Sequence, residues 1–122
     1  MSSQYIFTVD NILVLESNVD SYTGFGIIYY SNSFINYIGQ FINGKCTGKG
    51  NKYYENGNLN YKGEYKNSKY NGKGIQYNKN GSKKYEGEFK DSMWNGRGIE
   101  YYENGNKKFD GEWKDGDITG QG

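Results

Sequence analysis

The glutamates of this chain are the side chains with the greatest potential for chemistry. Glu64, Glu86, Glu88 and Glu112 recur in copies of one short motif, interleaved with lysines. Two carboxylates can act as acid and base when their surroundings separate their pKa values, but alternation with lysine is typical of a solvated sheet face. Because the sequence also lacks histidine, a common general base and metal ligand, we expect no enzyme, no metal site and no cofactor.

Two other features could suggest reactivity. The Gly48–Gly50 segment and its copies are similar to a phosphate-binding loop, but the P-loop pattern and its strand–loop–helix context are missing. We interpret these glycine pairs as turns at repeat junctions. Cys46 is the single cysteine, and its position is occupied by Tyr70 and Trp94 in later copies of the motif. It is therefore expected to be a small packing residue.

The composition excludes several classes of protein. The 122 residues carry a net charge of +1, which gives no overall attraction to nucleic acid or anionic lipid. Mean hydropathy is −1.01, yet 18% of the residues are aromatic, and disordered chains are poor in aromatic residues. The sequence has no apolar run near the roughly 20 residues of a membrane span and no signal-peptide pattern. We expect a cytoplasmic protein.

A strict period of 24 residues organises the sequence. Three glycine series keep this step: Gly26, Gly50, Gly74, Gly98 and Gly122; Gly24, Gly48, Gly72, Gly96 and Gly120; Gly39, Gly63, Gly87 and Gly111. Three aromatic series keep it too: Tyr37, Tyr61, Tyr85 and Phe109; Phe41, Tyr65, Phe89 and Trp113; Tyr29, Tyr53, Tyr77 and Tyr101. A fixed period in this range indicates a repeat array.

Each repeat is predicted to be a β-hairpin. Tyr61, Gly63 and Tyr65 alternate with charged residues, so one strand face is aromatic and glycine and the other is charged. A ring can lie flat over a glycine of a neighbouring strand.

The hairpin turn is Asn56–Gly57 and its copies. A three-residue loop, Glu55–Gly57, pairs Tyr53 with Leu59 and is favoured because it places Tyr53 on the same face as Tyr61. The same parity assigns three isoleucines to the aromatic face: Ile27, Ile75 and Ile99.

The array has six predicted parts. Residues 1–23 form a degenerate hairpin that caps the array, four repeats follow at 24–47, 48–71, 72–95 and 96–119, and residues 120–122 begin a fifth. No C-terminal cap is visible in the sequence. Either the last edge is open for a partner, such as a second copy in a homodimer, or the sequence is part of a longer protein.

The motif Tyr85–Lys90 followed by Asn95–Gly98 resembles the MORN (membrane occupation and recognition nexus) repeat, and the resemblance covers residues 24–122. It implies an all-β fold: an elongated, groove-shaped, single-layer antiparallel sheet of tandem hairpins without helices. It also implies protein–protein scaffolding, often where membrane meets cytoskeleton, and in some members self-association. The departures are a period one residue longer than usual, Ser33 in place of a turn glycine, and Ile38 and Gln40 at positions that are usually charged.

Such a single-layer sheet has no second layer to cover its rings, so part of the aromatic face should stay open to a partner. An amphipathic helix or an extended peptide would suit this groove. The predicted partner-binding residues are Tyr53, Tyr65, Tyr77, Phe89, Tyr101 and Trp113.

Two alternative functions remain open. A peripheral phospholipid-binding module would use lysines beside the turns, which are Lys83, Lys84, Lys107 and Lys108, although interspersed acids oppose it. A sugar- or choline-binding array is also built from Tyr- and Gly-rich hairpins, but such arrays carry a secretory signal and more tryptophan than the two present here.

Overall fold

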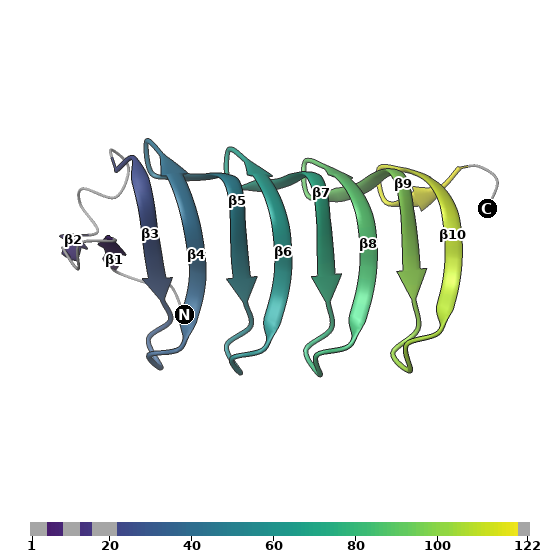
Figure 1. Ribbon diagram of the computed structural model, residues 1–122, viewed down its shortest axis with the longest axis horizontal. Helices are drawn as coiled ribbons and strands as arrows, with labels where there is room; N and C mark the ends of the chain where they lie inside the picture. The colour runs from purple at the N-terminus through teal and green to yellow at the C-terminus, as the bar shows by residue number, and fades with distance from the viewer. Residues whose placement is uncertain (1–4, 9–12, 16–21, 120–122) are drawn as a thin grey trace.

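The structure is a computed structural model that describes residues 5–8, 13–15 and 22–119. The described residues form strands and turns without a helix, and consecutive hairpins stand side by side in a row (Figure 1). The strands are β1 (Tyr5–Thr8), β2 (Leu13–Leu15), β3 (Gly24–Tyr29), β4 (Ile35–Ile42), β5 (Lys45–Tyr53), β6 (Leu59–Lys66), β7 (Lys69–Tyr77), β8 (Lys83–Lys90), β9 (Met93–Tyr101), β10 (Lys107–Lys114) and β11 (Asp117–Ile118). The predicted all-β array of hairpins is confirmed.

All these strands belong to one antiparallel sheet. From β3 to β11 every strand pairs with the next strand in the chain, while β1 pairs with β3 and β2 lies outside β1. β1 and β2 fall within the segment predicted to cap the array, and they extend the sheet beyond β3. The turn between them lies outside the described residues.

The loops that connect β5 to β6, and the equivalent strands of other repeats, have three residues as predicted. Tyr54 N donates to Asn58 O at 2.8 Å, and Gly57 has a φ of 93°. Asn56 Oδ1 accepts from Asn58 N at 2.9 Å, so the asparagine side chain closes the turn.

The junctions between repeats are different from those we expected. The chain reverses at two-residue turns with both central residues at positive φ, the signature of a type I′ hairpin, as at Asn67 (51°) and Ser68 (65°). The glycine pairs lie inside the strands instead. Gly72, with a φ of 102°, sits where the register shifts between β6 and β7, so it bends the strand rather than turning the chain.

This bend brings rings together on one side of the sheet. Tyr61 pairs with Gln76 and Tyr65 pairs with Tyr70, yet the rings of Tyr61 and Tyr70 stack at a centroid distance of 3.8 Å. On a flat sheet Tyr70, which is opposite Tyr65, would lie four residues along the strand from Tyr61, or about 13 Å away, too far to stack. The aromatic face is therefore the inner side of the bend.

Among the residues whose side chains the structure describes, the fully buried core is aromatic. The buried hydrophobic side chains of the described residues are Tyr37, Phe41, Tyr61, Tyr65, Tyr85, Phe89 and Trp113. Neighbouring rings meet edge to face, a favourable geometry for aromatic pairs: Tyr61 lies 5.2 Å from Tyr65 in its own strand and 5.2 Å from Phe89 in the next hairpin. The hydroxyl of Tyr61 is not left unpaired, because its Oη donates to Glu64 O at 2.7 Å. Burial also raises the pKa of the equivalent hydroxyl, that of Tyr85, to about 12.

Glycine makes room for the buried tyrosine rings, as predicted. A Cβ at Gly74 would lie 2.5 Å from Cε1 of Tyr61, and a Cβ at Gly63 would lie 2.5 Å from the Cα of Gly74. Tyr61 therefore rests on a glycine of the following repeat.

One prediction about the strand faces is wrong. Tyr53 does pair with Leu59, but the next pair is Lys52 with Tyr61, so Asn60 is an extra residue that forms a β-bulge. One extra residue reverses the side on which the preceding strand presents its side chains. Tyr53 therefore faces away from Tyr61. The three isoleucines, Ile27, Ile75 and Ile99, also lie on the face opposite the rings, because they pair with Ile38, Glu86 and Asp110.

Two tyrosines of the same strand should respond in opposite ways to loss of the hydroxyl. Within the described part of the chain, Tyr65 Oη is buried without a hydrogen-bond partner, and Phe41 and Phe89 occupy its position in other repeats. Tyr65→Phe should raise the free energy of unfolding by about 1 kcal/mol, and Tyr61→Phe should lower it by about 1 kcal/mol because its bond to Glu64 O is lost. Urea denaturation of both variants tests this. A loss of stability in Tyr65→Phe would contradict it.

A methyl group at Gly74 should be poorly tolerated. Gly74→Ala should lower the free energy of unfolding by about 1–3 kcal/mol, because the new Cβ would overlap the Tyr61 ring. Gly81→Ala is the matched control, since a Cβ there meets nothing within 4 Å and the cost comes only from the positive φ of 96°, about 1 kcal/mol. In thermal denaturation, adding Tyr61→Leu should restore part of the stability that Gly74→Ala loses and should not restore the stability that Gly81→Ala loses. That result would identify the Tyr61 ring as the cause. Equal effects would contradict it.

Candidate protein-binding face

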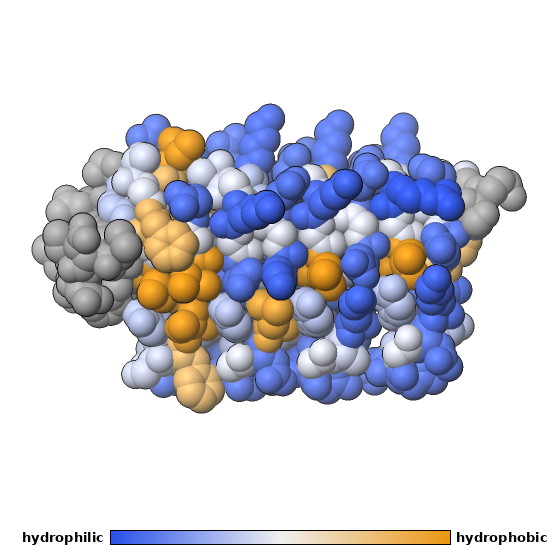
Figure 2. Space-filling model, in the orientation of Figure 1, coloured by the Kyte–Doolittle hydropathy of each residue, from blue (hydrophilic) through white to orange (hydrophobic). Residues whose placement is uncertain are grey.

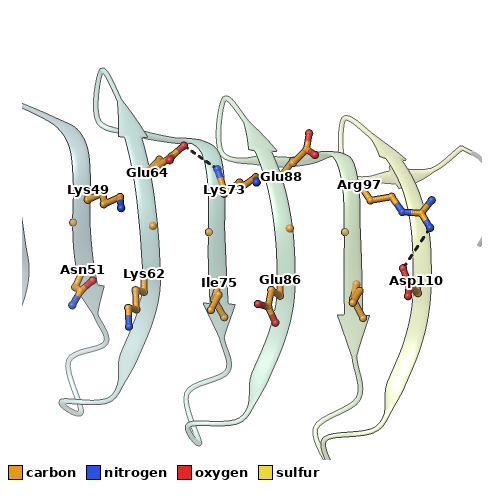
Figure 3. Close-up of a pocket in the computed structure, with 16 residues that line it drawn as sticks. Lys49, Asn51, Lys62, Glu64, Lys73, Ile75, Glu86, Glu88, Arg97 and Asp110 are labelled. Carbon is orange, nitrogen blue, oxygen red and sulfur yellow. Dashed lines mark hydrogen bonds and ion pairs between the residues drawn. The ribbon is translucent and has the colours of Figure 1, made fainter.

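A trough runs across the sheet on the face opposite the rings (Figure 3). It crosses β5 to β10 and has a volume of about 690 Å³. Its floor is the backbone of a row of cross-strand glycines, Gly50, Gly63, Gly74, Gly87 and Gly98. A side chain at these positions would point toward the rings on the other face, so the floor of the trough is backbone between two rows of longer side chains.

One wall of the trough alternates in charge from strand to strand. Its members are Lys49, Glu64, Lys73, Glu88 and Arg97. Glu64 Oε1 accepts from the backbone N of Lys73 at 3.1 Å, and Arg97 lies 3.4 Å from Glu112 and 4.0 Å from Asp110. Two of the five charged side chains of this wall, Glu64 and Arg97, therefore have a polar contact on a neighbouring strand.

The other wall combines apolar and charged side chains. Its members are Asn51, Lys62, Ile75, Glu86, Ile99 and Asp110. Ile75 and Ile99 are half-buried and occupy equivalent positions in successive repeats. The trough therefore offers apolar contact, charges of both signs and exposed backbone, which are the ingredients of a protein-binding surface.

An apolar patch continues this face beyond β5. In the first repeat, Phe25 and Gln40 replace a charged pair, and Ile27 faces Ile38. Phe25 is 39% exposed, and Figure 2 shows hydrophobic residues gathered over this end of the array. Ile38 pairs with Asn51 of the trough wall, so the patch and the trough form one continuous surface.

A row of tyrosines borders the trough on the side of the three-residue loops. Its members are Tyr29, Tyr53, Tyr77 and Tyr101, one from each repeat, all half-buried. Each pairs with a residue of the following strand, in order Ile35, Leu59, Lys83 and Lys107. Lys83 Nζ lies 5.4 Å from the ring centroid of Tyr101, within the range of a cation–π contact.

The structure divides the six predicted partner-binding residues between the two faces. Tyr65, Phe89 and Trp113 belong to the core and are 6%, 4% and 5% exposed, so these rings are not the open surface that we expected. Tyr53, Tyr77 and Tyr101 lie in the tyrosine row on the other face. Sequence reasoning missed the trough itself, because the bulge that assigns each residue to a face has no signature in the glycine and aromatic periods.

The four lysines predicted to bind lipid do not form one cationic surface. Lys107 lies 4.0 Å from Asp110, which lines the trough. Lys108 lies 3.5 Å from Glu100. Glu100 pairs with the buried Tyr85 and is therefore on the face of the rings. Neighbouring lysines therefore point to opposite faces. Lys83 and Lys84 hold the equivalent positions in the preceding repeat, and Lys83 contacts Glu86 at 2.8 Å.

Other kinds of site find little support among the described residues. They contain no group of three or more acidic, cysteine or histidine side chains placed to hold a metal ion. The same residues contain no helix long and apolar enough to cross a membrane. Cys46 is a free, half-buried thiol that packs against the core, and burial raises its pKa, which fits the packing role that we expected.

The repeats identify the class of the protein. The MORN repeat family matches residues 37–59, 61–83, 85–107 and 109–122, more than half of the chain. The chain therefore belongs to the MORN repeat family. The MORN repeat is a non-enzymatic repeat type, and MORN repeats generally act as protein- or membrane-interaction modules. No curated protein matches the chain.

The arrangement of the lysines predicts weak binding to anionic membranes. A free surface lysine contributes about 1 kcal/mol to such binding, but three of these four contact carboxylates on two different faces. We expect little more co-sedimentation with phosphatidylserine vesicles than with neutral vesicles at physiological salt. Lys84→Ala/Lys108→Ala should behave like the native chain. Strong, salt-sensitive sedimentation that this double variant abolishes would contradict the prediction.

Proposed function

We propose that this protein is a non-enzymatic scaffold or adaptor that holds a protein partner on the trough face. The observation that carries the proposal is the half-buried pair Ile75 and Ile99 on a bare glycine floor, between charges of both signs. Three of the rings first assigned to the partner, Tyr65, Phe89 and Trp113, are buried on the other side of the sheet. Their burial leaves the trough face as the surface that varies from repeat to repeat and can recognise a partner.

The alternatives fit the surface less well. The charges lining the trough are balanced, with four basic side chains (Lys49, Lys62, Lys73 and Arg97) and four acidic ones (Glu64, Glu86, Glu88 and Asp110), which does not favour an anionic membrane. A sugar or choline site would need aromatic rings with open faces. Trp113 is buried and Trp94 stacks on Tyr85 at 4.4 Å, so the tryptophans serve the core.

The dimensions of the trough suit a single polypeptide segment. Six strands span five spacings of roughly 4.8 Å, about 24 Å in all. That length corresponds to about 16 residues of helix at 1.5 Å per residue, or to about seven residues in an extended conformation. Either shape can bury apolar side chains against the isoleucines while its polar groups meet the charged walls.

Charges placed on the isoleucines of the trough should abolish partner capture. Ile75→Glu/Ile99→Glu would bury two unpaired carboxylates in the interface, so proteins that co-purify with the native chain should be reduced at least about tenfold, a loss typical of central interface residues. Ile118→Glu is the control, because Ile118 is 53% exposed and lies outside the trough.

Quantitative affinity capture compares the three proteins, and circular dichroism confirms that each variant is folded. Capture that survives in the folded double variant would contradict the proposal. Equal loss in Ile118→Glu would show that the trough is not the relevant surface.

A further inference from the structure

The tyrosine row has a spacing that restricts what can bind to it. Its members Tyr29, Tyr53 and Tyr77 are two strands apart, and two strand spacings amount to about 9.6 Å. A polyproline II helix repeats every three residues, or roughly 9.3 Å. A segment with this conformation would therefore present the same residue position to each successive gap between tyrosines.

The interval between successive tyrosines, which we call a gap, holds a different side chain in each case, and two of these side chains are apolar. Ile35 on β4 pairs with Tyr29, and Leu59 on β6 pairs with Tyr53, so a half-buried aliphatic residue follows each of these tyrosines along the row. An apolar gap between two tyrosines is the kind of groove that proline-rich segments occupy in their known receptors.

The third gap is already filled. Lys83 lies between Tyr77 and Tyr101, with its ammonium over the Tyr101 ring at 5.4 Å and 2.8 Å from Glu86. A proline there would have to displace a paired lysine. The row therefore offers two sites for proline, three residues apart in a bound segment.

The charges near these gaps indicate the net charge of the ligand. Trough residues on β5 to β7 include three lysines, Lys49, Lys62 and Lys73, and one glutamate, Glu64. Those on β8 to β10 include three carboxylates, Glu86, Glu88 and Asp110, and one arginine, Arg97. The gap at Leu59 lies at the positive end, and the gap at Ile35 borders the apolar pair Ile27 and Ile38. Lys62 is exposed on the same strand as Leu59, so it can pair with an acidic side chain of a segment bound in the second gap.

We propose that the partner segment is an acidic, proline-rich peptide in polyproline II conformation, with two prolines three residues apart. The prolines occupy the gaps over Ile35 and Leu59, and an acidic residue faces Lys62. This inference rests on the proposed function, because it names the partner of the same face. It differs from an amphipathic helix, which would present one stripe every seven residues, or about 10.5 Å, and would lie in the trough over Ile75 and Ile99.

Isothermal titration calorimetry with synthetic peptides tests the proposal on the full chain. The first peptide has ten residues with two prolines three apart and flanking glutamates. The second has the same composition with the prolines two residues apart. The third is a 16-residue amphipathic helical peptide. We expect the first to bind with a Kd of about 10–500 μM and the second to bind at least about tenfold more weakly, because its prolines cannot fill both gaps.

Variants of the row locate the site. Tyr53→Ala should weaken binding of the first peptide at least about tenfold, because Tyr53 borders both gaps. Tyr53→Phe should retain binding, which shows that the ring is what matters and guards against a folding defect in the alanine variant. Lys62→Glu should weaken binding about fivefold or more at low salt and less at high salt. Tyr102→Ala is the matched control, because Tyr102 is 51% exposed and lies one residue outside the row.

The outcomes separate this inference from the proposed function. Equal binding of the first two peptides, or an equal effect of Tyr53→Ala and Tyr102→Ala, would overturn the proline assignment. So would the absence of measurable binding at about 1 mM peptide. If the helical peptide binds instead and Ile75→Glu/Ile99→Glu abolishes its binding, the inference fails while the proposed function stands. If neither peptide binds and partner capture is insensitive to that double variant, both fail.

Discussion

The contact between a tyrosine ring and a glycine of the next repeat is the constraint on which the sheet depends. Tyr61 fills the space that a side chain at Gly74 would occupy, and its hydroxyl is satisfied by a carbonyl of its own strand. The ring therefore needs no second layer above it, because the bend of the strands supplies Tyr70 as its cover. Since each ring rests on the following repeat, stability comes from contacts between nearest neighbours, as in other repeat arrays.

Burial of the rings on one side determines what the other side can do. Residues that alternate with the rings are not needed for packing, so they differ between repeats, as Lys62, Glu86 and Asp110 do at one position. The first repeat has Ile38 at that position. Residues on the trough face can therefore vary from repeat to repeat and recognise a partner, while the rings and glycines of the opposite face keep the 24-residue period.

The sequence was sufficient to predict the repeats, the hairpins, the three-residue loops and the ring-on-glycine contacts, because each has a local or periodic signature. Residues Asn56–Gly57 specify their turn directly. The two faces could not be assigned correctly, since the bulge at Asn60 is set by how neighbouring strands fit together. Without the bulge, Tyr53 was assigned to the face of Tyr65, and the trough on the opposite face was not predicted. The glycine pair that includes Gly72 was predicted to turn the chain between repeats, but Gly72 bends a strand. A glycine at positive φ occurs both in turns and in strand bends.

Hydrogen bonds from one repeat to the next hold the backbone of the candidate binding face. Tyr30 Oη donates to the carbonyl of Tyr53, and Tyr54 Oη donates to the carbonyl of Tyr77, both at 2.6 Å. These bonds hold the backbone of two members of the tyrosine row. In the third repeat the donor position is Asn78, whose side chain donates to Ser82 within its own loop at 3.0 Å. The tyrosine row is therefore held most firmly around Tyr53 and Tyr77, where its gaps are apolar, and a rigid site loses less conformational entropy when a partner binds.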